Sequence, residues 1–387
     1  MNEMNKKIIV DQMLLTTDAP TTAGSKMLDG YLSLLEAEAL TRAKAAGYAT
    51  AGKADVGEFA IDLLGETCYR GALTENGILK NAAANLLISG DATAALCLDV
   101  NGAPRRAAAQ SGLVSVKPTY GRVSRYGTVP VACSGETVSV LAKTASDCRT
   151  LLDVIAGHDA KDGTSLSDEA CAKANDATPV RRIALLTNFK ADEDVTKKMD
   201  EAVKAFQANG VEIVEIDNEI IAAARPAWNV LMSAELCNNV SRYDGVKYGY
   251  RAENFSGIDE LYTNSRTEAF GKLLKTAILF GSETLSTENY KKVYDKCLRT
   301  RRVICEEFAK LFGEFDALLL PATSAMTYSE ATVAENPHAA FEENRYTAPA
   351  SITGLPAVVA SGVQLIGRSF SENALLDAAK ILTKENA

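Results

Sequence analysis

The amino-acid sequence predicts a globular α/β protein, because strand-like and helix-like apolar patterns alternate along it. The clearest example lies in the middle of the chain. Residues 182–187, RIALLT, indicate a buried strand, residues 195–206 repeat apolar side chains at helical spacing, and residues 211–216 indicate the next strand. This segment is therefore expected to form a βαβ unit. Hydrophobic residues make up 47% of the 387 residues and charged residues 24%, which is typical of a folded chain with a large core.

The remaining elements follow the same alternation. Thr144 and Asp147 form a capping box at the start of a helix that reaches Ile155, and Gly157 is its expected end. Residues 164–181 are polar and predict a linker. The other expected elements are a strand with a polar turn at 7–16, strands at 48–53, 93–99 and 316–321, and helices at 28–46, 219–239 and 288–312.

Charge and cysteine content exclude several classes of protein. The net charge of −9 argues against a free-standing nucleic-acid binder, because phosphate contacts need clustered Lys and Arg. No apolar run is long enough to span a bilayer, and the N-terminal MNEMNKK is not followed by an apolar signal core. Eight cysteines without a CxxC motif, and only two histidines, predict reduced thiols in a cytoplasmic protein and no metal site.

The stretch from Cys97 to Gly127, CLDVNGAPRRAAAQSGLVSVKPTYGRVSRYG, is specific enough to indicate a family. Its second half, KPTYGRVSRYG, resembles the amidase-signature enzymes, most closely the A subunits of aspartyl/glutamyl-tRNA amidotransferases. Residues 241–251, SRYDGVKYGYR, resemble the same branch. The resemblance implies one amidase-signature domain over residues 1–387, with a large twisted mixed β-sheet flanked by helices on both faces and residues 164–181 as a linker within it. It implies no cofactor, and the family's N-terminal helical segment has no counterpart here.

The resemblance also implies that the family's nucleophile has been replaced. In the family a loop of the form GSDTGGSxRxPA precedes this stretch, and its last serine attacks the substrate. Counting back from Lys117 without gaps places Asp99 and Arg105 on the family's aspartate and arginine, and Ala103 on the nucleophile. An alanine side chain has no lone pair with which to attack a carbonyl carbon.

Two further catalytic positions differ in the same alignment. The family's relay serine, in a GGSSGG loop, falls on Leu79, and we expect this loop to have relaxed into a helix over about residues 79–87. The family's lysine, counted back from Thr21, falls on Asp11. An aspartate there is either a strand-end carboxylate in solvent, which is the simpler interpretation, or a base that reverses the charge of the site.

The substrate-binding positions are partly kept. Arg301, on the expected helix at 288–312, falls on the arginine that holds the carboxylate of glutamine in the family, although a solvated basic helix face explains it equally well. Asn344 falls on the family's aspartate for the glutamine amine, where the loss of charge weakens recognition of an ammonium group.

These replacements favour a degenerate amidase-like protein that binds the usual partners of such an amidotransferase component, namely the B and C subunits. One alternative is an active glutamine amidohydrolase or amidotransferase component that supplies ammonia for Gln-tRNA or Asn-tRNA formation with another nucleophile. A second is a sensor that binds glutamine near Arg301. Candidate substitute nucleophiles near the old site are Cys97, Cys133, Ser111, Ser115 and Ser134, although none has a recognisable base beside it.

Overall fold

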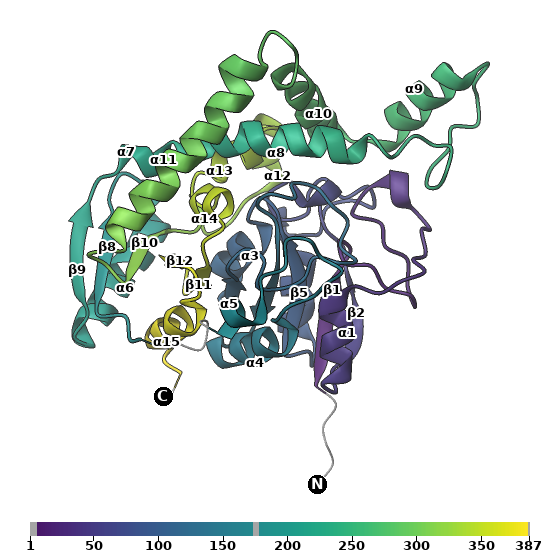
Figure 1. Ribbon diagram of the computed structural model, residues 1–387. Coiled ribbons are helices and arrows are strands. Elements are labelled where there is room, and N and C mark those ends of the chain that lie inside the picture. The colour runs from purple at the N-terminus through teal and green to yellow at the C-terminus, as the bar shows by residue number, and fades with distance from the viewer. Residues whose placement is uncertain (1–5, 173–177, 386–387) are drawn as a thin grey trace.

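A single large sheet organises the molecule. The computed structural model describes residues 6–172 and 178–385, and within them ten strands pair into one sheet (Figure 1). In chain order these strands are β1 (Lys7–Asp11), β2 (Ala49–Ala54), β5 (Ala94–Asp99), β6 (Val114–Lys117), β7 (Thr137–Ala142), β8 (Arg182–Leu186), β9 (Glu212–Ile216), β10 (Ala317–Pro321), β11 (Ala357–Ala360) and β12 (Val363–Gly367). The expected large mixed sheet is confirmed.

The sheet is parallel toward its two edges and antiparallel in the middle. Its strand order is β2-β1-β5-β7-β6-β11-β12-β10-β8-β9. The pairs formed by β1 with β2 and β5, and by β8 with β9 and β10, are parallel, whereas the pairs from β5 to β10 through the centre are antiparallel. Every residue of β5, β6 and β7 is buried, as expected for strands covered by helices on both faces.

Helices surround this sheet, and one group forms a separate layer at the top of Figure 1. In that layer α8 packs against α10 and α11, while α9 lies further out. The helices are α1 (Glu38–Ala45), α2 (Ala82–Ser89), α3 (Ala103–Ser111), α4 (Ala145–Ile155), α5 (Asp168–Ala172), α6 (Glu193–Ala208), α7 (Glu219–Ala222), α8 (Ala224–Val240), α9 (Ile258–Ala269), α10 (Lys272–Thr284), α11 (Asp295–Leu311), α12 (Glu330–Glu335), α13 (Ala339–Glu343), α14 (Ala348–Thr353) and α15 (Glu372–Thr383).

The expected helix over residues 28–46 is wrong in its first half. Helix α1 begins only at Glu38, and Leu32, which was expected on its buried stripe, is 58% exposed. The preceding backbone pairs with distant segments: the Ala37 N–H donates to the Leu15 carbonyl and the Thr21 N–H donates to the Tyr31 carbonyl. These tertiary hydrogen bonds compete with helical ones, which periodicity does not reveal.

Three other expected elements are refined in detail. The helix at 288–312 consists of a π-helical turn, Tyr290–Tyr294, followed by α11. The linker at 164–181 contains the short helix α5, and its residues 173–177 lie outside the described part of the chain. The predicted cap of α4 is present, since Thr144 Oγ1 accepts the Asp147 N–H at 3.0 Å.

Candidate functional site

The carboxyl ends of β1 and β5 bring two of the sequence's candidate segments together. These strands are parallel neighbours, with Val10 opposite Leu96. Asp11 ends β1 and Asp99 ends β5, and the loop that follows Asp99 leads into α3, whose first residue is Ala103. The fold therefore places the positions of Asp11 and Ala103 at the same edge of the sheet.

Asp99 and Arg105 form a fully buried ion pair at this edge. The Arg105 Nε and Nη2 atoms donate to the two Asp99 carboxylate oxygens at 2.8 and 3.0 Å. Burial opposes ionisation of Asp99, but the charge and hydrogen bonds of Arg105 outweigh it and lower the pKa of this carboxyl. Arg105 also donates to the Thr347 carbonyl, Gln364 Oε1 and Ser351 Oγ, so it joins the loop to the C-terminal elements.

Asp11 is buried, which corrects the expectation of a strand-end carboxylate in solvent. It is 2% exposed, and its two carboxylate oxygens accept the N–H groups of Met13 and Leu98, each at 2.8 Å. Burial raises the pKa of Asp11 to about 6, against the opposing effects of these hydrogen bonds and of the Lys53 charge. The sequence pattern did not reveal this, because a polar residue at a strand end is usually solvated.

Lys53 lies near Asp11, although the sequence analysis assigned it no role in the site. Its Nζ atom donates to the Leu14 carbonyl, Thr16 Oγ1 and Thr21 Oγ1 at 3.1, 3.1 and 2.6 Å. Burial lowers the pKa of Lys53 to about 8, while the charge of Asp11 opposes this shift. The signal that would have found it is its position at the end of β2, the strand paired in parallel with β1.

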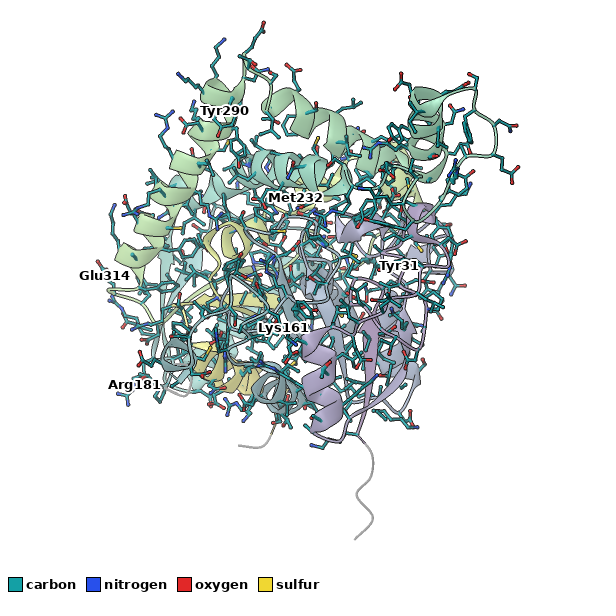
Figure 2. The ribbon with its side chains drawn as sticks, turned by 45° about the vertical axis from the view of Figure 1, so that its right-hand side comes forward. Tyr31, Lys161, Arg181, Met232, Tyr290 and Glu314 are labelled. Carbon is teal, nitrogen blue, oxygen red and sulfur yellow. The ribbon has the colours of Figure 1, made fainter. Side chains whose placement is uncertain are left out.

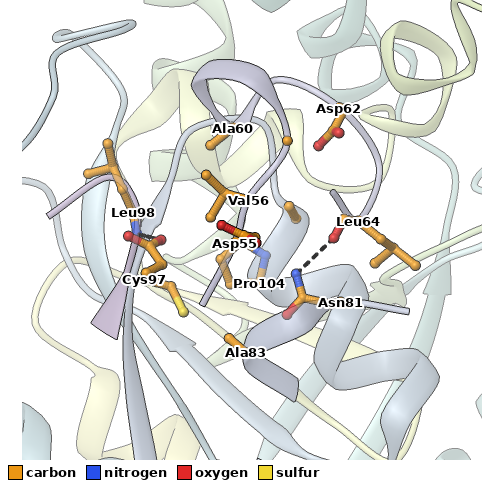
Figure 3. A pocket seen from close by; sticks show the side chains of 13 residues that line it. Asp55, Val56, Ala60, Asp62, Leu64, Asn81, Ala83, Cys97, Leu98 and Pro104 are labelled. Carbon is orange, nitrogen blue, oxygen red and sulfur yellow. Dashed lines mark hydrogen bonds between the residues drawn. The ribbon is translucent and has the colours of Figure 1, made fainter. Parts of the chain in front are cut away.

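A small cavity lies between these segments (Figure 3). Its volume is about 20 Å³, which is room for about one water molecule. Asp11 and Ala103 both line this cavity. Leu79 does not, because it lies in β4 (Ile78–Leu79) and lines a different cavity. The lining residues are Asp11, Asp55, Val56, Gly57, Ala60, Asp62, Leu64, Asn81, Ala83, Cys97, Leu98, Ala103 and Pro104.

Leu79 is not helical, contrary to the expected helix over residues 79–87. Strand β4 pairs with β3 (Thr74–Glu75) through a turn in which Asn76 and Gly77 both have positive φ. Asn81 caps α2 by accepting the Ala84 N–H at 3.1 Å, so this helix begins at Ala82. An Asn-Gly pair is the preferred sequence for such a two-residue hairpin turn, and it was the signal that could have predicted β3 and β4.

Asp62 is another buried carboxyl of the cavity that the sequence motifs did not indicate. Its Oδ2 atom accepts the N–H and the hydroxyl of Thr67, both at 2.8 Å, while its Oδ1 atom has no hydrogen-bond partner among the described residues. Burial and the neighbouring Glu66 charge raise the pKa of Asp62 well above its usual value. A Cβ atom at Gly57 would overlap the Asp62 carboxyl, so a larger residue there would have to displace this side chain.

Neither candidate cysteine is activated as a nucleophile, whereas the Ser134 hydroxyl donates to the Glu235 carboxylate. Cys97 lines the cavity, but burial and the charges of Asp11 and Asp99 raise the pKa of its thiol well above the usual value. Burial likewise raises the pKa of the Cys133 thiol. A thiol with a raised pKa is a poor nucleophile, because the thiolate is the reactive form. Ser115 is fully buried on β6.

Arg301 and Asn344 are both engaged by their own chain and do not line this cavity. Arg301 donates from Nη1 to the Ser134 hydroxyl at 3.1 Å and from Nη2 to the Ser134 carbonyl at 2.8 Å, and the Ser134 hydroxyl in turn donates to Glu235. The Asn344 Nδ2 atom donates to the side-chain oxygens of Asn101 and Asn229 at 2.9 and 2.6 Å. These contacts use both Nη atoms of Arg301 and the Nδ2 atom of Asn344, whereas the buried Asn344 Oδ1 atom has no hydrogen-bond partner among the described residues.

Residues 6–172 and 178–385 contain neither a cluster of potential metal ligands nor a helix that could span a membrane. No group of three or more His, Cys, Asp or Glu side chains is arranged there to hold a metal ion. No helix in this part of the chain is long and apolar enough to cross a membrane.

Comparison with known proteins decides the family. The amidase family model matches residues 8–376. The chain belongs to the amidase family. It is 36% identical to the A subunit of glutamyl-tRNA(Gln) amidotransferase from Acinetobacter baumannii ATCC 17978, over 93% of this chain and 78% of that protein. The protein of the same name from Lachnoclostridium phytofermentans is 35% identical, over 94% of this chain and 79% of its own.

Solved structures agree with this assignment. The crystal structure of the A subunit of glutamyl-tRNA(Gln) amidotransferase from Thermotoga maritima matches with a TM-score of 0.81 and 25% identity, covering 98% of this chain and 83% of that one. The urea amidolyase of K. lactis has the same fold, with a TM-score of 0.81 and 22% identity over 97% of this chain and 23% of its own. The resemblance drawn from residues 97–127 and 241–251 is thus confirmed, both for the family and for the amidotransferase branch within it.

Proposed function

We propose that this chain is a catalytically degenerate amidase that acts as a structural or regulatory partner of amidotransferase subunits. The observation that carries the proposal is Ala103 at the start of α3, beside a cavity of only about 20 Å³. An alanine there cannot attack an amide carbon, and the cavity has room for about one water molecule but not for glutamine.

The surroundings of the cavity support the same conclusion. Leu79 offers no hydroxyl to relay a proton, and Asp11 is held by two backbone N–H groups and cannot replace a lysine in charge. Arg301 and Asn344 hydrogen-bond within the chain. The fold itself is intact around the Asp99–Arg105 pair, as binding of a partner protein requires.

The partners we propose are the B and C subunits of an amidotransferase, and the proposed location is the cytoplasm. The support comes from the relatives that match over more than nine tenths of this chain, since they are themselves amidotransferase components. We further propose that residues 1–387 unfold as one domain, since the ten strands belong to one sheet.

Assays of ammonia release from glutamine and asparagine test the degeneracy directly. We expect wild-type protein to release ammonia no faster than buffer. Cys97→Ala and Ser134→Ala serve as paired controls, because each removes one candidate nucleophile. If the wild type releases ammonia and either substitution abolishes this activity, the protein is an active hydrolase and the proposal is wrong.

Co-purification tests the partner role separately. A tagged chain isolated from its native cell is expected to bring down proteins homologous to amidotransferase B and C subunits in stoichiometric amounts. Recovery of the chain alone, from cells that express those subunits, would contradict the structural role even if the protein proved catalytically inert.

Glutamine sensing is the weaker alternative, because the Nη atoms of Arg301 already donate to Ser134 of the same chain. A sensor would show a glutamine-dependent rise in the melting temperature that Arg301→Ala abolishes. We expect no rise in the wild type at millimolar glutamine.

A further inference from the structure

One segment of this acidic protein is basic. The chain carries a net charge of −9, yet residues 290–302, YKKVYDKCLRTRR, contain six Lys and Arg side chains and a single acidic one, Asp295. The net charge of the whole chain argued against nucleic-acid binding, but phosphate contacts depend on local clustering of cations.

This segment lies at an end of the molecule, where the chain reverses direction between α10 and α11. Figure 1 shows the connection between these two helices projecting beyond the sheet, and Figure 2 labels Tyr290 at this extremity. Residues Tyr290–Tyr294 form a π-helical turn, a rare conformation that often marks functional positions. Tyr290 is 46% exposed, and its ring centroid lies 5.3 Å from that of Tyr294.

The arginines of this segment are already paired, whereas its lysines are not. Arg299 pairs with Asp295 at 2.8 Å, Arg302 pairs with Glu306 at 2.6 Å, and Arg301 turns inward to Ser134. The exposed lysines of this segment form no ion pair with any residue of the described chain; they are Lys291, Lys292 and Lys296. On α6, the exposed Lys197 pairs with Glu193 and the exposed Lys198 pairs with Glu201. The third exposed lysine of α6, Lys204, forms no ion pair with any described residue.

We propose that the basic tip, defined as Tyr290, Lys291, Lys292 and Lys296, binds the phosphate backbone of RNA. Lysine is depleted in the cores of protein–protein interfaces but serves phosphates well as a point charge. An exposed tyrosine next to such lysines, here Tyr290, offers a face on which an unpaired base stacks. This binding is electrostatic and independent of sequence, and it does not rest on the proposed function.

Fluorescence anisotropy of a labelled RNA stem-loop with the full-length protein tests this proposal. Three phosphate contacts predict a slope of about −2.7 in log K against log salt, so affinity falls about 40-fold between about 50 and 200 mM KCl. The variant with Lys291→Gln, Lys292→Gln and Lys296→Gln is expected to bind at least about tenfold more weakly at low salt, with a slope near zero.

Two matched variants separate the basic tip from general charge effects. Lys197→Gln, Lys198→Gln and Lys204→Gln on α6 change the net charge equally and are expected to leave RNA binding unchanged. Replacing the three tip lysines by arginine is expected to preserve the salt slope. Thermal melts of all variants establish that each one is folded.

Three outcomes would overturn the proposal. One is an absence of RNA binding by the wild type at low salt. A second is equal weakening by the α6 variant, which would assign the effect to net charge. The third is competition by poly-L-glutamate. If it displaces the labelled RNA as effectively as unlabelled RNA does at the same concentration of negative charges, the basic tip would be assigned to an acidic protein partner.

Discussion

The ends of β1 and β5 carry two fully buried aspartates that differ in their partners. Asp99 meets the guanidinium of Arg105, and its pKa is lowered despite burial. Asp11 meets only backbone N–H groups at hydrogen-bond distance, and burial raises its pKa to about 6. Two side chains at the same sheet edge therefore respond to pH with opposite sign, and the difference comes from one cation in contact with one of them.

Removing that cation is expected to have the largest effect. Arg105→Met leaves the Asp99 charge buried without a partner, and it should lower the free energy of unfolding by about 3–5 kcal/mol. Urea denaturation measures this difference. A loss below about 1 kcal/mol would show that Asp99 becomes protonated or hydrated at little cost, and the contrast between the two aspartates would disappear.

The second-largest loss of stability is expected from a substitution in the loop after Asp99. Gly102 has a φ of +89°, and a Cβ atom there would lie 2.4 Å from Thr347, so Gly102→Ala should cost about 2–3 kcal/mol from strain and overpacking. Gly47→Ala is the matched control, because Gly47 has a φ of +88° with nothing within 4 Å of the added Cβ. It should cost about 1 kcal/mol. Equal losses in urea denaturation would mean that the contact with Thr347 is unimportant.

The pH dependence of stability tests Asp11. Its pKa of about 6 in the folded state exceeds the ordinary 3.8, so protonation stabilises the folded state, and this contribution is lost as pH rises through 6. Relative to Asp11→Asn, the wild type should lose about 1.4 kcal/mol of unfolding free energy between about pH 5 and pH 8. Chemical denaturation at both pH values measures this. If the wild type instead gains stability over this pH range, Asp11 behaves like Asp99, as a carboxylate whose charge a nearby cation stabilises.

The smallest effect on stability is expected from an exposed ion pair with a single hydrogen bond. Arg302 contacts Glu306 at 2.6 Å, but both side chains are more than half exposed. Arg302→Met should change the free energy of unfolding by less than about 0.5 kcal/mol, since water and salt screen the pair. A larger loss in urea denaturation would show that burial is not what distinguishes Asp99 and Arg105.

Family, fold class and most strands followed from the sequence alone. Strands such as β5 and β8 are continuous apolar runs, and the Thr144 side chain caps the start of α4. Both features depend only on residues that are close together along the chain. The identity of Ala103 is likewise a property of the sequence, as is its position shortly before KPTYG.

Only the tertiary structure decided how the site is filled. The burial of Asp11 depends on the Leu98 amide across the sheet, and the engagement of Arg301 and Asn344 depends on Ser134 and Asn101. The missing first half of the expected helix at 28–46 has the same origin, since the Ala37 N–H binds a carbonyl of Leu15. Periodicity records contacts between residues a few positions apart, whereas these contacts join residues that only the folded sheet brings together.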